Sequence, residues 1–273
     1  MDLTARRAEF RRLHESGCFV IPNPWDVGSA RYLQSLGFKA LATTSGGFAF
    51  SRGLPDGGVS RDEELKHVAE IVAATSLPVN ADFEDGYARE PEGVAENVRL
   101  CVETGVAGLS IEDATGEREK PLYDFSLAVE RVRAARAAVG DSGVLLTARA
   151  ECFLVNHPDA LQESIRRLQA YSEAGADVLY APGPTQREQI EAIVKAVSPK
   201  PVNGLMHTNS GLRVGDLAEM GVRRISVGAA LARTAWTGFI RAAKLIAEEG
   251  SFAGFEGLVP GRELNEFFSK RSS

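Results

Sequence analysis

The stretch LPVNADFEDGYA, residues 77–88, begins like a buried β-strand and ends in three carboxylates. Its apolar residues alternate with small or polar ones as far as Asp82, and Glu84 and Asp85 follow almost directly. Unpaired carboxylates are costly to bury, and they protonate rather than remain charged in an apolar core. The stretch therefore predicts either a polar turn that caps the next helix or a strand end that holds a metal ion.

Seven further short apolar runs share the character of residues 78–85, and longer amphipathic segments separate them. These runs are residues 18–26, 39–45, 107–113, 144–151, 177–183, 201–207 and 224–228. Segments 62–75, 92–105 and 124–140 carry apolar residues at the i, i+3, i+4 spacing of helices. Eight strands that alternate with helices predict parallel βα units, and a chain of 273 residues suits a (β/α)8 TIM barrel.

The main competing architecture is a doubly wound sheet. No predicted strand runs into a G-x-G-x-x-G turn, and the glycines of residues 43–50, TTSGGFAF, lack that spacing. A long helix at about 229–249 and a tail follow the eighth strand, with no linker or repeat. We therefore expect one barrel domain over residues 1–273, with a C-terminal helical extension from about residue 229 to residue 273.

Composition narrows the class of protein. The net charge is −6, and acidic and basic residues are interspersed without a basic run, which argues against a nucleic-acid partner. No apolar run reaches the length of a transmembrane helix, and the charged start lacks an apolar signal core. The three cysteines are spaced for neither a disulfide framework nor a zinc site. We expect a cytoplasmic globular protein with no membrane partner.

Strand alternation predicts where the polar side chains point. Successive strand residues face opposite ways, and one phase of each strand collects polar groups near its carboxyl end. In a barrel this phase converges on the mouth, where active sites of the fold lie. The residues of this phase are Asn23, Trp25, Thr43, Ser45, Asn80, Asp82, Glu84, Ser110, Glu112, Thr147, Arg149, Glu151, Tyr180, Asn203 and His207.

Three of these residues form a candidate metal site. Asp82 and Glu84 stand at i and i+2 on one strand, and Glu112 closes the next strand. Carboxylates this close repel one another, and a hard cation such as Mg²⁺, or Mn²⁺, relieves the repulsion. The alternative is that Arg149 pairs with these acids, and both arrangements can coexist.

Two further features suit an anionic substrate. The hydroxyl of Ser45 and the N–H groups of Gly46 and Gly47 could form a concave anion-binding turn after strand two. Arg149 offers a rigid fork for carboxylate or phosphate. No lysine is expected inside the barrel near the strand ends, which argues against Schiff-base chemistry. A small 2-oxo or dicarboxylic acid therefore fits the predicted pocket.

Five motifs in order, TTSGG, LPDGG, VNADFEDGYA, SIEDATG and TARAE, give the chain a family resemblance over roughly residues 15–235. It resembles the isocitrate lyase/phosphoenolpyruvate (PEP) mutase superfamily. The resemblance implies a (β/α)8 barrel with a swapped eighth helix, in a homo-oligomer that is a dimer or, more usually, a tetramer. It also implies Mg²⁺ and the cleavage or formation of a C–C or P–C bond beside a 2-oxo acid, through an enolate-like intermediate.

The resemblance also assigns roles to residues. Asp82 resembles the direct metal ligand. Glu84 stands where the family usually has an aspartate that holds the metal through water, and Glu112 matches the next acidic position. Ser45, Gly46 and Gly47 match the carboxylate-binding turn, and Arg149 matches the substrate-binding arginine. Asp56, in LPDGG, matches an acidic residue beside the reacting centre.

The chain departs from the lyases of this superfamily in the loop after strand four. Where those enzymes carry K-[KR]-C-G-H, residues 118–122 read REKPL, so that Arg118 replaces the lysine and Lys120 the catalytic cysteine. We expect loop 114–125 to close as a lid and to bring Arg118 or Lys120 to the substrate. Leu205 stands at the family's strand-seven asparagine, and Asn203 and His207 could substitute for it.

These observations predict a Mg²⁺-dependent lyase that cleaves a C–C bond in a small 2-oxo or 2-hydroxy dicarboxylate, similar to oxaloacetate or methylisocitrate. One alternative is P–C chemistry on a phosphonopyruvate-like substrate, and another is a non-catalytic barrel that binds 2-oxo acids. Four phenylalanines in the tail predict self-association through an exposed apolar surface, unless they fold back on their own barrel. These four residues are Phe252, Phe255, Phe267 and Phe268.

Overall fold

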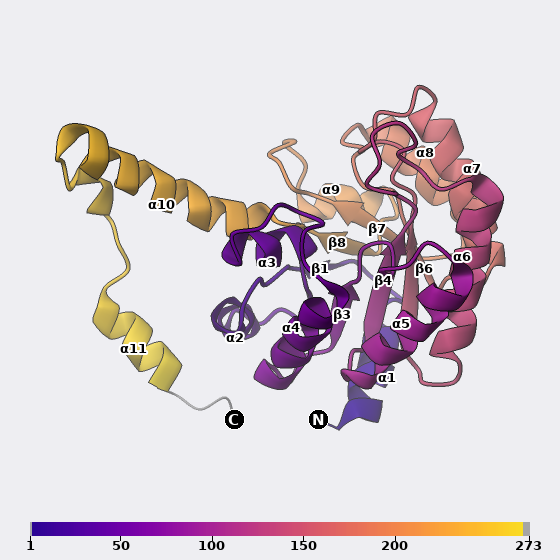
Figure 1. Ribbon diagram of the computed structural model, residues 1–273, viewed down its shortest axis with the longest axis horizontal. Helices are drawn as coiled ribbons and strands as arrows, with labels where there is room; N and C mark the ends of the chain where they lie inside the picture. The colour runs from indigo at the N-terminus through magenta and orange to yellow at the C-terminus, as the bar shows by residue number, and fades with distance from the viewer. Residues whose placement is uncertain (1, 270–273) are drawn as a thin grey trace.

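The structure, a computed structural model, describes residues 2–269 and contains eight parallel strands with helices between them (Figure 1). The strands are β1 (Phe19–Ile21), β2 (Leu41–Ala42), β3 (Val79–Asp82), β4 (Gly108–Glu112), β5 (Leu145–Arg149), β6 (Val178–Tyr180), β7 (Val202–Leu205) and β8 (Arg224–Ser226). Hydrogen-bonded neighbours run in the order β1-β8-β7-β6-β5-β4-β3-β2. The Ala42 N–H donates to the Pro22 carbonyl at 3.1 Å and joins β2 to the end of β1. The predicted (β/α)8 TIM barrel is therefore confirmed, as a nearly closed barrel.

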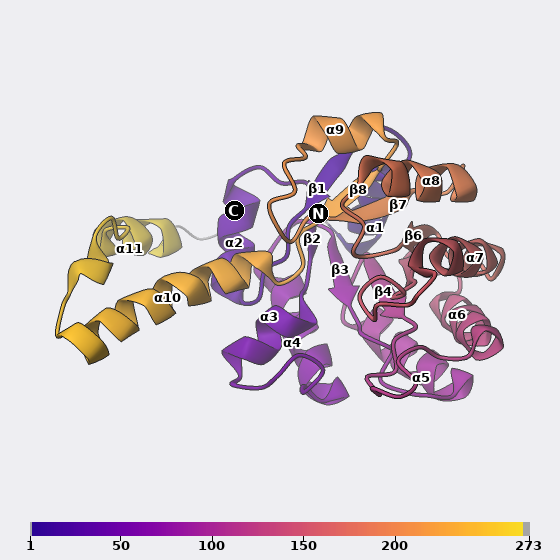
Figure 2. The same ribbon diagram turned by 90° about the horizontal axis from the view of Figure 1, so that it is seen from above.

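Helices surround the strands, as the view from above shows (Figure 2). They are α1 (Leu3–Leu13), α2 (Val27–Ser35), α3 (Ser45–Ser51), α4 (Arg61–Ala74), α5 (Pro91–Glu103), α6 (Phe125–Val139), α7 (Ala160–Glu173), α8 (Arg187–Val197), α9 (Val214–Glu219), α10 (Ala230–Glu249) and α11 (Gly261–Ser269), with a 3₁₀ turn η1 (Ala253–Phe255). The three helical segments predicted at 62–75, 92–105 and 124–140 are confirmed within a residue or two at each end. Among residues 2–269, no helix is both long and apolar enough to cross a bilayer.

The apolar phase of the strands packs outward against the helices. Leu109, Leu146 and Ala148 are fully buried in the largest apolar cluster, together with residues of α5, α6 and α7. Phe10 of α1 forms a second cluster with residues near the starts of β1, β2 and β5. Helix α1 therefore covers the amino-terminal end of the barrel, and only the carboxyl-terminal end is left for a site.

The segment after β2 is a helix rather than the predicted turn. Thr44 caps α3, and its side-chain oxygen accepts a hydrogen bond from the Gly47 N–H at 3.2 Å. A Cβ atom on Gly47 would lie only 2.6 Å from Thr44 Cγ2. Only glycine permits this packing, so the glycine pair that suggested a turn in fact serves a helix start.

Helix α10, η1 and α11 form an arm that projects from the barrel (Figures 1 and 2). Only Ala232 of α10 is buried, while Trp236, Phe239 and Ile240 are exposed. Within α11, the ring of Phe267 lies edge-on to Tyr32 of α2, with centroids 5.3 Å apart. Phe267 and Phe268 thus fold back on their own chain, whereas Phe252 and Phe255 stay exposed. The last four residues of the predicted extension, 270–273, lie outside the described residues.

We expect the arm to hold the protein in a dimer or tetramer, because an exposed apolar surface of this size is rare on monomers. Phe239→Glu should shift the sedimentation coefficient toward that of a monomer, and so should a stop codon after Gly250. Leu36→Glu is the matched control, because Leu36 on the barrel is 59% exposed and Phe239 is 61% exposed. A wild-type chain that sediments as a monomer at micromolar concentration would contradict this expectation.

Candidate active site

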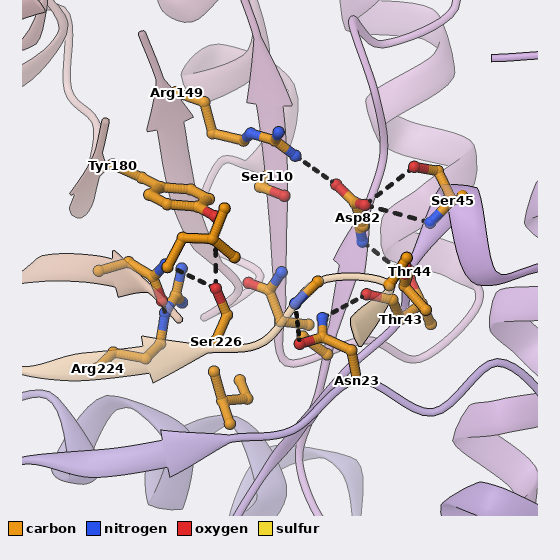
Figure 3. A pocket seen from close by; sticks show the side chains of 18 of the residues that line it. Asn23, Thr43, Thr44, Ser45, Asp82, Ser110, Arg149, Tyr180, Arg224 and Ser226 are labelled. Carbon is orange, nitrogen blue, oxygen red and sulfur yellow. Dashed lines mark hydrogen bonds and ion pairs between the residues drawn. The ribbon is translucent and has the colours of Figure 1, made fainter. Parts of the chain in front are cut away.

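A cavity of about 140 Å³ lies inside the barrel and reaches its carboxyl-terminal end (Figure 3). Every strand, or the residue that follows it, contributes to the lining. The polar lining residues are Asn23, Thr43, Thr44, Ser45, Asp56, Asn80, Asp82, Ser110, Arg149, Tyr180, Asn203, Arg224 and Ser226. Active sites of TIM barrels lie at this end, because the loops that follow the strands converge there.

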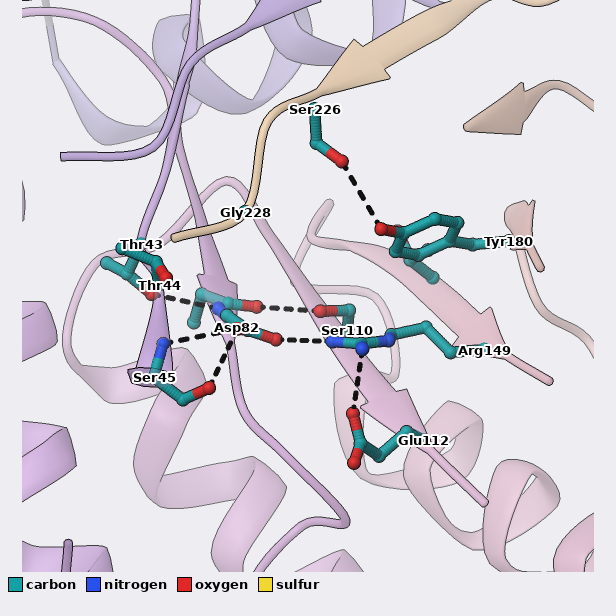
Figure 4. A network of polar contacts seen from close by, with 12 residues as sticks. Thr43, Thr44, Ser45, Asp82, Ser110, Glu112, Arg149, Tyr180, Ser226 and Gly228 are labelled. Carbon is teal, nitrogen blue, oxygen red and sulfur yellow. Dashed lines mark hydrogen bonds and ion pairs between the residues drawn. The ribbon is translucent and has the colours of Figure 1, made fainter. Parts of the chain in front are cut away.

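Arg149, at the end of β5, is the centre of the charge network in this cavity (Figure 4). Its Nη1 lies 2.7 Å from Asp82 Oδ1, and its Nη2 lies 3.0 Å from Glu112 Oε2. Its Nε lies 2.8 Å from Glu151 Oε1. Burial alone would lower the pKa of Arg149, but the charges of these three carboxylates outweigh burial and raise it well above its usual value. The guanidinium is therefore a permanent cation that holds acids from three successive strands.

Strand register explains why Arg149 and Glu112 meet. The two residues are directly opposite each other in the β4–β5 ladder, so their side chains leave the sheet side by side. Burial raises the pKa of Glu112, and the charge of Arg149 opposes that shift. The structure therefore contains the pairing of Arg149 with two of the three predicted metal-binding acids, Asp82 and Glu112, which the sequence left as one of two alternatives.

Asp82 is held from its other side by the start of α3. The backbone N–H of Ser45 donates to Asp82 Oδ2 at 3.2 Å, and the Ser45 hydroxyl donates to the same oxygen at 3.1 Å. The Asp82 N–H donates to Thr43 Oγ1 at 2.9 Å, which fixes the end of β3. The predicted anion-binding turn thus holds a carboxylate in this structure, and that carboxylate belongs to the protein.

Asp56, in the loop after α3, also reaches this point. Its Oδ1 lies 3.3 Å from Ser45 Oγ, and a Cβ atom on Gly46 would lie 2.9 Å from its Oδ2. Burial and, after it, the charge of Asp82 raise the pKa of Asp56 above its ordinary value. Asp56 is therefore a pocket carboxyl that can keep a proton at higher pH than an exposed aspartate.

Glu84 does not share the face of Asp82, contrary to the alternation argument. Strand β3 ends at Asp82, and the backbone of Glu84 is left-handed, with a φ of 44°. Alternation applies only while the chain stays extended, so the turn carries Glu84 away from the cavity lining. Its Oε1 is buried and has no hydrogen-bond partner among the described residues. Burial first, and then the charges of Asp82 and Asp56, raise its pKa to about 7.

The residues at this site fit Mg²⁺ by chemistry but do not form a ready-made cage. Within residues 2–269, no three His, Cys, Asp or Glu side chains are grouped closely enough to hold a metal. Arg149 lies between Asp82 and Glu112, and Glu84 stands apart. The carboxylates nevertheless outnumber the single guanidinium among them, and the charge of Asp82 adds to burial, the larger cause, in raising the pKa values of Glu84 and Asp56. An oxygen-only donor set with excess negative charge suits a hard divalent cation.

Glu84→Gln is expected to stabilise the metal-free protein at high pH. In the folded state the Glu84 pKa is raised from 4.5 to about 7, so its ionisation destabilises the fold progressively across that interval. The glutamine variant lacks this loss. In the presence of chelator, the melting temperatures of the variant and the wild type should be equal near pH 4.5. The variant should become progressively more stable than the wild type as the pH rises to about 7. Glu103→Gln, at the exposed end of α5, is the control, and an advantage independent of pH would contradict this prediction.

Of four further residues predicted for the site, three lie outside the cavity lining and one is part of it. Arg118 and Lys120 lie outside its lining, and Lys120 Nζ pairs with Asp124 at 2.7 Å. His207 also lies outside, with a buried Nδ1 that has no partner in the described chain. Asn203 does line the cavity, although its amide is bonded to Ser226 and to Arg224.

Three polar lining residues, Thr44, Arg224 and Ser226, were not among the residues predicted from the sequence. Arg224 and Ser226 belong to the run at residues 224–228, which was taken only as the eighth strand. They stand at i and i+2, so strand parity could have placed them together. Arg224 stands at the start of β8, whereas the predicted site residues were sought near the carboxyl end of each strand.

Several known proteins are similar to this chain in sequence and structure. The phosphoenolpyruvate phosphomutase family model matches residues 10–247. A crystal structure from Burkholderia cenocepacia J2315, whose description names a lyase/mutase and no substrate, is 47% identical, with a TM-score of 0.93 over 98% of this chain and 97% of that one. The oxaloacetate decarboxylase of Pseudomonas entomophila (strain L48) is 33% identical over 81% of this chain and 78% of its own. The structure of 2,3-dimethylmalate lyase, described as a superfamily member, is 27% identical, with a TM-score of 0.83 over 97% and 94% of the two chains.

The fold and the site define a TIM-barrel enzyme with a compact, carboxylate-rich active site at the carboxyl ends of its strands. The chain belongs to the isocitrate lyase/PEP mutase superfamily, whose members are carbon–carbon lyases or mutases. The predicted family is thereby confirmed. The alternative of a non-catalytic barrel is set aside, since the chain is an enzyme of this lyase and mutase class.

Proposed function

We propose that this enzyme is a Mg²⁺-dependent lyase that cleaves a C–C bond in a small 2-oxo or 2-hydroxy dicarboxylate. The observation that carries the proposal is the contact of Asp82 with Arg149 on one side and with the start of α3 on the other. At one point of the cavity, a carboxylate that could bind a metal ion thus lies beside a guanidinium and the hydrogen-bond donors of Ser45. The names of two relatives, an oxaloacetate decarboxylase and a 2,3-dimethylmalate lyase, denote substrates of this kind.

Asp82 would hold Mg²⁺, and Glu112 and Glu84, which lie outside the cavity lining, would add negative charge from further away. When bound, the ion would supply positive charge to a 2-oxo acid and to the enolate that bond cleavage leaves. The Ser45 hydroxyl and backbone N–H would bind a substrate carboxylate, because these two groups already donate to the carboxylate of Asp82. Arg149 would orient that group with its rigid fork.

A proton must also be moved, and the loop cysteine of related lyases is absent from this chain. Asp56 and Tyr180 are the acids that the cavity offers, since both line it and His207 does not. Burial raises the pKa of Tyr180 to about 12, so its hydroxyl stays protonated and serves as a hydrogen-bond donor. Asp56 holds its proton more firmly than an ordinary aspartate and lies beside Ser45. We assign proton transfer to Asp56.

A substrate panel tests the proposal. Oxaloacetate, 2-methylisocitrate, isocitrate and phosphonopyruvate are each incubated with enzyme and Mg²⁺, and products are measured by NMR. We expect turnover of a dicarboxylate with C–C cleavage, abolished by excess chelator and restored by Mg²⁺. Release of phosphate from phosphonopyruvate without C–C cleavage would favour P–C chemistry instead. Full turnover in chelator would contradict the metal requirement.

The loop at residues 114–125 is expected to act as a lid. It is closed on itself by a bridge between Ala114 and Leu122, so its charges reach the cavity only if the loop moves as a unit. Replacing both Arg118 and Lys120 by alanine should lower kcat much more than it lowers Mg²⁺ affinity, because lid closure excludes water. The control is Arg133→Ala, an exposed arginine of α6 outside this loop. A kcat within about twofold of wild type, worth only about 0.4 kcal/mol, would show that neither residue takes part in catalysis.

A further inference from the structure

Arg224 is a second arginine inside the barrel, and the acids that surround Arg149 form ion pairs with Arg149 and not with Arg224. It begins β8, and only 3% of its surface is exposed. It lines the same cavity as Asp82 and Ser45. In Figure 3 it lies across the cavity from these two residues, beyond Tyr180 and Ser226.

All the neighbours that hold Arg224 are uncharged. Its Nε donates to Asn203 Oδ1 at 2.7 Å, and its Nη2 donates to Thr147 Oγ1 at 3.1 Å. Its Nη1 lies 3.5 Å from His14 Nε2. Burial, with the charge of Arg224 as a second cause, lowers the pKa of His14 to about 3, so this imidazole is neutral near pH 7. No Asp or Glu among residues 2–269 forms an ion pair with Arg224.

The two arginines of the cavity therefore differ in the number of carboxylates that neutralise their positive charge. Three carboxylates surround Arg149, and none pairs with Arg224. Burial lowers the pKa of Arg224 only to about 10, so it is charged at neutral pH. A guanidinium has five N–H groups, and three contacts account for three of them. A buried and unpaired ion is costly, and a ligand that supplies the missing negative charge removes that cost.

The groups beside Arg224 can also donate to an anion. The Asn203 amide donates to Ser226 Oγ at 2.9 Å, and the Ser226 hydroxyl donates to the Tyr180 oxygen at 3.4 Å. Because Tyr180 accepts the last of these hydrogen bonds, its own hydroxyl hydrogen stays available to a ligand. Tyr180 and Ser226 line the cavity between Arg224 and the mouth.

We propose that Arg224, with Tyr180, forms an inner subsite that binds one carboxylate of a small dicarboxylate in the cavity. The other end of the ligand lies toward Ser45 and Arg149. This inference rests on the proposed function and adds to it a residue that selects dicarboxylates over monocarboxylates. A monocarboxylate would leave the buried charge of Arg224 unpaired, and sites with an unpaired buried group reject the ligand that fails to reach it.

Succinate and butyrate test the inner subsite, because they share a four-carbon chain and differ by one carboxylate. Both are unreactive, so calorimetric titration in Mg²⁺ measures binding alone. In wild type we expect succinate to bind at least about tenfold more tightly, a difference of about 1.4 kcal/mol. Arg224→Met should remove this preference and leave butyrate affinity within about threefold, or about 0.7 kcal/mol. Arg223→Met is the matched control, because the Arg223 guanidinium instead donates to the Gly17 carbonyl at the surface.

Retention of the succinate preference in folded Arg224→Met would overturn the proposal, and so would equal affinities in wild type. If the variant does not fold, a crystal structure of wild type with succinate decides. One carboxylate within hydrogen-bond distance of Arg224 supports the subsite, and both carboxylates elsewhere refute it. Turnover of the substrate panel is measured separately, so the subsite and the proposed reaction can fail independently.

Discussion

Replacing Asp82 by asparagine is expected to lower kcat/KM by at least about a thousandfold, or about 4 kcal/mol. Asparagine keeps the shape of the side chain but removes the charge that faces Arg149 at 2.7 Å and that would bind Mg²⁺. The concentration of Mg²⁺ needed for half-maximal activity should rise as well. Steady-state kinetics over a Mg²⁺ series measures both effects, with circular dichroism as the check on folding.

Asp62→Asn is the control for this experiment, because Asp62 is an exposed carboxylate of α4 that pairs with Arg61 outside the cavity. It should leave the kinetics unchanged. If Asp82→Asn kept activity within about tenfold of wild type, a loss of about 1.4 kcal/mol, Asp82 would not be the primary metal ligand.

Replacing Arg149 by lysine is expected to lower kcat/KM by at least about a hundredfold, or about 2.7 kcal/mol. Lysine keeps the charge, but its single ammonium group cannot contact Asp82, Glu112 and Glu151 with the geometry of the guanidinium fork. The acids would move, and the substrate carboxylate would lose its planar partner. The loss should fall mainly on kcat, since positioning matters most in the transition state.

Arg149→Met separates catalysis from folding. It leaves buried carboxylates without their cation, and removing one member of a buried pair costs about 3–5 kcal/mol of stability. Chemical denaturation should therefore show a large loss for methionine and a small one for lysine. Arg187→Lys, in an exposed pair with Glu191 on α8, is the control. Wild-type kinetics in Arg149→Lys would mean that Arg149 serves only the structure.

Most of the barrel could be predicted from the sequence because its signals are local. Each apolar run contains one observed strand, from residues 19–21 in the first to 224–226 in the last. The runs were longer than the strands, since the polar residues after each strand belong to loops. The predicted turn at Ser45 is the start of a helix, because tertiary packing decides whether a Gly-Gly segment forms a turn or a helix.

Alternation also placed part of the site correctly in space, as far as the strands extend. Asp82 and Arg149 end their strands and line one cavity. The same rule failed for Glu84, two residues further on, where the backbone is left-handed. Sequence position could not show that the loop of Arg118 and Lys120 is closed on itself, because that closure depends on the bridge between Ala114 and Leu122.

The sequence by itself determined the (β/α)8 barrel, its superfamily and the acids and arginine at the carboxyl ends of the central strands, because period and motif are properties of neighbours in the chain. Only the tertiary structure decided how charge is shared between the two arginines that line the cavity. Arg149 meets three carboxylates, while Arg224 meets none among the described residues. Charge balance depends on distances between different strands and on burial, and neither is written in the order of the residues.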